Sequence, residues 1–231
     1  EKLGLSPGLS LDLTVHDETG QPWDFSKKEM REKAERLFAE REPALVVACP
    51  FCGPFSSWMF INFQKMEEAE VRRRLQEALE HLRFALDICA RQHSRGGLFV
   101  FEHPVAATSW GTRMMAAMLA LDGVETFNFD FCTLGMQTQD EHGKLGAARK
   151  RTKVLTNSRH VAEALRRCQC PGHHMHIHLE NGKAKECEKY PEMFSELIVK
   201  ALMREMADIE WLESIKKNVE NGATDVTEKF E

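Results

Sequence analysis

A short apolar run that ends in a loop rich in proline and glycine is the feature that most constrains the fold of this chain. Residues 44–49 read Ala-Leu-Val-Val-Ala-Cys, and residues 50–56 read Pro-Phe-Cys-Gly-Pro-Phe-Ser. A continuous apolar run bounded by turn residues is typical of a strand buried on both faces, as in the parallel sheets of α/β proteins. Ligands of such sheets bind at the carboxyl ends of strands. The sequence therefore predicts that Cys52 lies in a loop at a ligand-binding edge.

Helical and strand patterns alternate along the rest of the chain. Residues 67–92 carry apolar side chains at helical spacing with a charged opposite face, and residues 98–101 read as a second buried strand. Further helices are predicted over 27–41, 109–121 and 159–167, and strands over 9–14, 44–49, 124–130 and 151–155. Such alternation favours right-handed βαβ units. We therefore predict an α/β fold with a Rossmann-like, mainly parallel sheet flanked by helices.

The length and composition suit one main domain. A chain of 231 residues that is 42% hydrophobic can bury a core of the size found in single α/β domains. We assign this domain to residues 1–206 and expect a Cys/His-rich hairpin to be inserted in it at residues 168–190. Residues 207–231 are expected to form a C-terminal helix and tail.

Cysteine usage, hydropathy and charge limit the possible cellular compartments and binding partners. Seven scattered cysteines do not make a disulfide framework in a chain of this length, so we expect an intracellular protein, nuclear or cytoplasmic. No apolar run approaches the ~20 residues of a membrane span, so no membrane partner is expected. The net charge of −5 argues against nucleic-acid binding through bulk charge, although residues 149–151 could form a local basic groove.

Three motifs, in order, resemble those of the cytosine-C5 DNA methyltransferases. Residues 51–56 are similar to the family's nucleophile loop Pro-Cys-Gln-x-Phe-Ser, with phenylalanine in place of its proline and glycine in place of its glutamine. Residues 102–104, Glu-His-Pro, follow a buried strand as the family's Glu-Asn-Val does, and residues 148–156 look like its Gln-x-Arg-x-Arg strand. Motifs from Gly4 to Pro191 resemble more closely a domain found within retroelement polyproteins. The resemblance implies a retroelement domain similar to the methyltransferase catalytic core.

The resemblance also implies roles for individual residues. Cys52 would add as a thiolate to cytosine C6, and Glu102 would hydrogen-bond or protonate N3. Arg149 and Arg151, at alternate positions of a strand, would lie on one face and orient the base carbonyl. The partner would be a nucleic acid, DNA in the resembled family, with the target base flipped out of the duplex stack.

S-adenosylmethionine is the cofactor that the resemblance implies. Acidic residues at strand ends commonly hydrogen-bond a cofactor ribose in nucleotide-binding α/β folds. Asp12 lies near the end of the predicted strand over 9–14 and Asp24 lies near a strand end or turn, so by order these two would hold the ribose and adenine. The first strand and glycine-rich turn that would bind the methionine end are expected to precede residue 1.

Other functions remain open. The chain could be a non-catalytic nucleic-acid-binding or assembly module of a retroelement polyprotein. Cys49-Pro-Phe-Cys52 has the Cys-x-x-Cys spacing of thiol redox proteins. That pair closes a strand instead of opening a helix, where a helix dipole would lower the thiol pKa. Cys52 could also be an ordinary loop cysteine.

A Cys/His-rich segment suggests a zinc site. Thiolates and imidazoles are zinc ligands, and Cys168, Cys170 and Cys187 with one of His173 or His174 could supply four. The alternative is an exposed hairpin without metal, in which His174, His176 and His178 alternate along one face of a strand.

Overall fold

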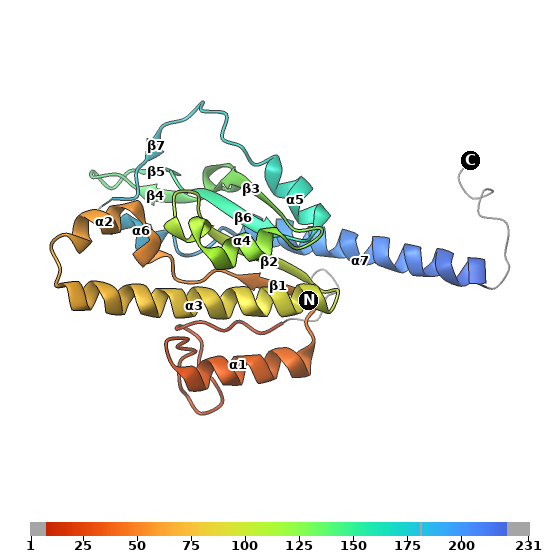
Figure 1. The fold of residues 1–231 in the computed structure, drawn as a ribbon. Coiled ribbons are helices and arrows are strands. Elements are labelled where there is room, and N and C mark those ends of the chain that lie inside the picture. Colours follow the sequence, from red (N-terminus) through yellow and green to blue (C-terminus); the bar gives the residue numbers. More distant parts are fainter. Residues whose placement is uncertain (1–7, 181, 221–231) are drawn as a thin grey trace. The chain divides into compact units, whose positions relative to one another are not determined.

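The computed structural model describes residues 8–180 and 182–220 (Figure 1). The chain is of the α/β class, as predicted, with helices and two small mixed sheets. It divides into two compact units that interleave in sequence. The first unit comprises residues 1–126 and 152–157, and the second comprises residues 127–151 and 158–231.

The helices of the first unit agree in most places with the periodicity of the sequence. The predicted helices over 27–41 and 67–92 are confirmed as α1 and α3. The predicted helix over 109–121 is divided, because Thr112 has an extended backbone and its hydroxyl accepts a hydrogen bond from the Met115 amide, which caps α4. The bounds are α1 Lys28–Arg41, the 3-10 helix η1 Gly53–Phe55, α2 Ser57–Phe63, α3 Glu68–Ser94, the 3-10 helix η2 Thr108–Gly111 and α4 Arg113–Leu119.

Four strands form the larger sheet, in the order β1-β2-β6-β3. Their bounds are β1 Leu45–Ala48, β2 Leu98–Pro104, β3 Glu125–Asp130 and β6 Arg151–Thr156. β1 and β2 pair in parallel, with Ala48 opposite Phe101, whereas β2 and β6 pair antiparallel, with Val100 opposite Thr156. The sheet is therefore mixed. The first of the two chain segments that make up the first unit ends within β3, after Thr126.

The core of the first unit lies between α3 and one face of the sheet (Figure 1). Leu82 and Cys89 of α3 pack in one cluster with Phe99 and Phe101 of β2, and all four are 0% exposed. The parallel strands β1 and β2 are joined through α3, so this part of the chain is a βαβ unit. The cluster holds α3 against the two strands whose ends carry the predicted catalytic residues.

The predicted strand over residues 9–14 is wrong. This segment forms turns, and the nearest β-pairing among the described residues is an isolated bridge between His16 and Pro22. The Asp12 carboxylate accepts hydrogen bonds from the amide and the hydroxyl of Thr14, both at 2.6 Å. An aspartate that bonds its own backbone two residues further on stabilises a turn in competition with a strand.

The second unit contains short strands and two longer helices. Its elements after β3 are the 3-10 helix η3 Phe131–Leu134, β4 Gln137–Gln139, β5 Leu145–Ala148, α5 Arg159–Arg166, β7 His176–Ile177, α6 Lys183–Glu186 and α7 Glu192–Glu220. β4 pairs antiparallel with β5, and β5 pairs in parallel with β7. The Cys/His-rich segment 168–190 thus contains β7 and α6. The strand with which β7 pairs, β5, lies outside this segment.

Stacked aromatic rings form part of the interior of the second unit. Phe129 and Phe131 lie with ring centroids 4.6 Å apart, and Phe194 of α7 stacks on Phe129 at 5.9 Å. Phe131 also stacks on Tyr190 at 5.3 Å. These contacts hold the start of α7 against the end of β3. None of the helices in the described part of the chain has the length and apolar character needed to cross a membrane.

Candidate functional site

Cys52 lies in the loop that follows β1, at the start of η1. Its carbonyl accepts a hydrogen bond from the Phe55 amide at 3.0 Å, and the side chain of Phe55 is buried at 3% exposure. Pro54 in the same turn is also buried and has its φ restricted by its ring. Cys52 itself is half-buried. The loop is therefore held by its own turn and by a buried aromatic anchor.

The parallel pairing of β1 with β2 brings this loop to the same edge of the sheet as Glu102. Ala48, the last residue of β1, is opposite Phe101, and Glu102 follows directly in β2. Glu102 is 4% exposed and pairs with Val154 of β6. Side chains alternate along a strand, so Glu102 lies on the face opposite to that of Phe101.

His103 joins this edge of the sheet to the loop. Its Nε2 atom is 3.0 Å from the Pro50 carbonyl oxygen, and its Nδ1 atom is 2.8 Å from the Ser109 hydroxyl. A carbonyl oxygen can only accept, so Nε2 carries the proton and Nδ1 accepts from Ser109. Burial lowers the pKa of His103 to about 4, which favours the same neutral form. This role was not predicted from the sequence, although a histidine that follows a buried apolar run in a strand is a signal for a satisfied polar contact.

The two predicted cofactor ligands, Asp12 and Asp24, are engaged in local turns. The hydrogen bonds from Thr14 lower the pKa of Asp12. The Asp24 carboxylate accepts from the Ser26 hydroxyl at 2.6 Å and from the Ser26 amide at 3.1 Å, and these bonds lower the pKa of Asp24. Both carboxylates are charged and already bonded, and neither lies at the end of a strand.

The two predicted base-orienting arginines belong to the second unit, and both are exposed. Arg151 is the first residue of β6, and its Nε atom is 3.8 Å from the Asp130 carboxylate. Arg149 lies before β6, and its amide donates to the Ile177 carbonyl at 3.0 Å. The alternate spacing in the sequence therefore does not correspond to two positions of one strand.

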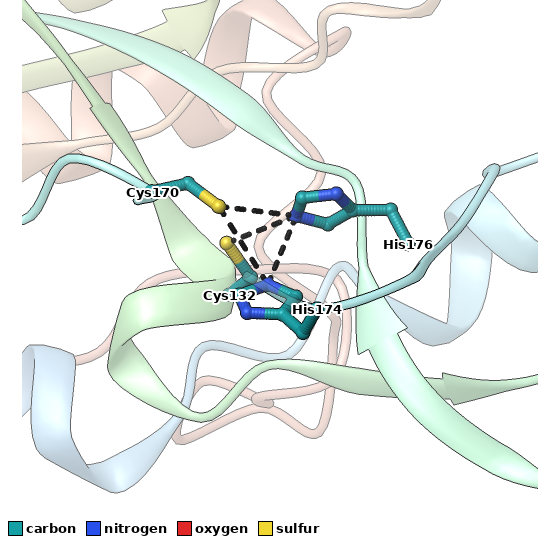
Figure 2. A group of neighbouring side chains, drawn as sticks. All are labelled: Cys132, Cys170, His174 and His176. Carbon is teal, nitrogen blue, oxygen red and sulfur yellow. Dashed lines mark hydrogen bonds between the residues drawn. The ribbon is translucent and has the colours of Figure 1, made fainter. Parts of the chain in front are cut away.

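Four Cys and His side chains converge in the second unit (Figure 2). They are Cys132 of η3, Cys170 and His174 of the loop after α5, and His176 of β7. Each residue offers one ligand atom, a cysteine Sγ or a histidine ring nitrogen. These four atoms all lie within 4.8 Å of one another. Three of the residues are half-buried, and His174 is exposed. This group could hold a metal ion.

The convergent group shares two residues with the metal ligands predicted from the sequence, Cys170 and His174. The Cys168 thiol instead donates to the Ala164 carbonyl at 3.6 Å, in the last turn of α5. Cys187 is 2% exposed and packs as a small apolar side chain, and His173 is exposed and lies outside the group.

The two ligands that the prediction omitted, Cys132 and His176, differ in how they could have been found. The spacing His174-x-His176 puts both imidazoles on one side of an extended chain, and this signal was visible in the sequence. Cys132 precedes β6 and α5, so only the fold brings it to the group. Burial and the nearby Cys170 thiol raise the pKa of Cys132 to about 11, so the thiol stays protonated unless a cation favours the thiolate.

Comparison of the chain with protein-family models, with curated proteins and with solved structures finds no match in any of the three.

Proposed function

We propose that the first unit uses Cys52 as a nucleophile toward a cytosine base of a nucleic acid, the chemistry of the cytosine-C5 DNA methyltransferases that its motifs resemble. One observation carries the proposal. β1 and β2 pair in parallel, with Ala48 opposite Phe101, so the Cys52 loop and Glu102 lie at one edge of the sheet. Substrates of α/β sheets bind at the carboxyl ends of parallel strands.

The proposed step is a reversible addition. The Cys52 thiolate forms a bond to C6 of the base, the electron pair of the C5–C6 double bond moves into the C4–C5 bond, and the displaced C4–N3 π pair takes up a proton at N3. Glu102 is the group that gives this proton to N3. C5 thereby becomes an enamine-type nucleophile, and elimination of the thiolate reverses the step. The base must leave the duplex stack, because C6 is inaccessible within it.

The contacts of His103 support a positioning role for this side chain. Its two ring nitrogens bond the Pro50 carbonyl and the Ser109 hydroxyl, so a buried and neutral imidazole ties the loop of Cys52 to β2. A nucleophile held on a constrained loop loses less entropy when it meets its target. The unit β1–α3–β2 also favours a Rossmann-like fold for the first unit.

The described residues do not fit the methyl donor that the resemblance implies. Asp12 and Asp24, the expected ligands of S-adenosylmethionine, are bonded within their own turns. The proposal is therefore confined to the thiolate addition. The kinship with retroelement polyprotein domains and DNA as the nucleic acid are part of the same proposal.

Exchange of the C5 hydrogen tests the addition without a methyl donor. When C5 is an enamine carbon it can take a proton from solvent, so a reversible adduct replaces deuterium at C5 with hydrogen. We expect the protein to release deuterium from oligonucleotides that carry 5-deuteriocytosine, measured by mass spectrometry on single-stranded and duplex DNA. Cys52→Ser should abolish the exchange. Glu102→Gln should slow it by about 10²-fold or more, the usual effect of losing a positioned proton donor.

Cys49→Ser is the matched control for the nucleophile. Cys49 follows β1 directly and should be dispensable, because only Cys52 lies in η1's turn. Equal loss of exchange in both cysteine variants would favour a dithiol redox pair. Exchange that persists in Cys52→Ser would contradict the assignment of the nucleophile. Nucleic-acid binding without any exchange would favour the non-catalytic retroelement module.

A further inference from the structure

We propose that Cys132, Cys170, His174 and His176 bind one Zn²⁺ as a structural site of the second unit. The four residues come from three places in the chain: η3, the loop after α5, and β7. All four belong to the second unit, whereas Cys52 belongs to the first, so zinc binding is independent of the chemistry of Cys52.

The distances between the four ligand atoms match those of a tetrahedral zinc site. Bonds of about 2.3 Å to sulfur and about 2.0 Å to nitrogen at tetrahedral angles require N···N of about 3.3 Å and S···N of about 3.5 Å. The two Nε2 atoms are 3.1 Å apart. Three of the four S···N distances within the group are 3.3, 3.5 and 3.6 Å (Figure 2), and all four ligand atoms lie within 4.8 Å of one another. These four distances are within about 0.3 Å of those that one tetrahedrally bound ion requires.

Hydrogen bonding alone cannot account for this convergence. A ring nitrogen offers either one N–H or one lone pair, so it makes one good hydrogen bond. The Nε2 atom of His176 nevertheless has three close neighbours, the Cys132 sulfur, the Cys170 sulfur and the His174 Nε2 atom. A cation at the centre resolves the conflict, because each of the four atoms then directs one lone pair at it.

The ligand types select zinc. Two thiolates and two imidazoles at tetrahedral positions suit Zn²⁺, whereas Mg²⁺ and Ca²⁺ prefer oxygen ligands. Four protein ligands complete the coordination shell and leave no position for water or substrate, which distinguishes a structural site from a catalytic one.

Backbone contacts around Cys170 support its role as a thiolate ligand. The Gly172 amide donates to the Cys170 sulfur at 3.4 Å, which stabilises negative charge there. The Cys170 amide donates to the Asp130 carboxylate at 2.9 Å, and the Asp130 amide donates to the Cys168 carbonyl at 2.9 Å. The end of β3 thus holds the loop in the position that the site needs.

Zinc would determine the conformation of a segment that has little other support. Residues 167–175 contain no helix or strand, and β7 is a strand of two residues. Bonds from one ion to η3, to the loop and to β7 tie these parts together. Without the ion, the two imidazoles and the two thiols would lack the interaction that brings them close together.

Metal analysis and cobalt spectroscopy test the site in the complete 231-residue chain. Protein purified from zinc-supplemented cells should contain about one equivalent of zinc by elemental analysis. After chelation, titration with Co²⁺ should give the intense ligand-field bands of tetrahedral cobalt and a thiolate-to-metal charge-transfer band, saturating at one equivalent. Added Zn²⁺ should displace the cobalt and remove both bands.

Matched variants identify the ligands. Cys132→Ser and His176→Gln should each weaken zinc binding by more than the roughly 10- to 100-fold cost of losing an outer-shell partner. His174→Gln should do the same, and because His174 is exposed this variant is expected to leave the rest of the unit folded. Cys168→Ser and His173→Gln are the controls and should bind one equivalent as tightly as the wild-type protein.

Two results would overturn the proposal. The first is a wild-type chain that takes up neither zinc nor cobalt with thiolate ligation. The second is full binding in His174→Gln together with loss in Cys168→Ser or His173→Gln, which would mean a different ligand set.

Discussion

Mild acid should destabilise the first unit through His103. The side chain is 1% exposed and burial lowers its pKa to about 4, whereas the ordinary histidine pKa is about 6.5. The folded pKa is the lower one, so between these values the unfolded chain binds more protons than the folded chain. The stability that depends on neutral His103 is therefore fully present above about pH 6.5 and is lost as the pH falls toward about 4.

The two pKa values give the size of this loss. Each unit of pKa difference corresponds to about 1.4 kcal/mol, so the loss approaches about 3.5 kcal/mol below about pH 4. At about pH 5 the unfolded imidazole is almost fully protonated, and the folded one is protonated in about a tenth of the molecules. The resulting loss of unfolding free energy relative to about pH 7.5 is about 2 kcal/mol, a large part of the roughly 5–15 kcal/mol that stabilises most proteins.

Urea unfolding at these two pH values, followed by tryptophan fluorescence, measures the loss. His103→Gln keeps an amide that can donate to the Pro50 carbonyl but does not titrate in this range, so the wild-type protein should lose about 2 kcal/mol more than this variant. The pKa of His81 is also lowered by burial, but His81 is present in both proteins and cancels. His142→Gln, which replaces an exposed histidine, should lose as much unfolding free energy between the two pH values as the wild-type protein. Equal losses in the wild-type and His103→Gln proteins would refute the reasoning.

Two further predictions concern the contacts around β2, and urea unfolding checks both. Gly97→Ala should cost about 1–3 kcal/mol, because its new Cβ would overlap the amide of Gln92, which is 0% exposed and cannot move away. Gly111→Ala, which meets nothing within 4 Å, should be neutral, and a similar cost in both variants would exclude overpacking as the cause. Asn157→Ala should cost about 1–3 kcal/mol, since the Asn157 side chain accepts from the Phe99 amide at 2.8 Å and donates to the Gly97 carbonyl at 2.9 Å. An unchanged free energy of unfolding in Asn157→Ala would mean that water replaces these bonds.

Much of the fold could be predicted where the pattern of apolar residues is long and local. α3 buries one side of its helix, and β1 and β2 are short apolar runs between turns, so each follows from periodicity alone. The segment around Asp12 is different. Its apolar residues alternate as in a strand, but the Asp12 side chain bonds the Thr14 amide and stabilises a turn.

The two candidate sites also differ in how far the sequence predicts them. The Cys52 loop and Glu102 could be related from the sequence, because two strands joined by a helix pair in parallel and end at one edge. The Cys/His group could be predicted only in part. Cys170 and His174 are close in sequence, but Cys132 reaches them only through the path of β3 and η3, which no local pattern encodes.

The position of β6 has a consequence for synthesis and for the design of fragments. β2 pairs with β6 across a long stretch of chain, from Pro104 opposite Thr152 to Val100 opposite Thr156. During translation the apolar edge of β2 stays open until residues 152–157 have emerged, and an open edge of this kind can recruit strands of other nascent chains. The chain also crosses between the two units three times. No single cut therefore separates them, and a fragment that ends at residue 126 would contain α3 and β2 but lack the strand that completes their sheet.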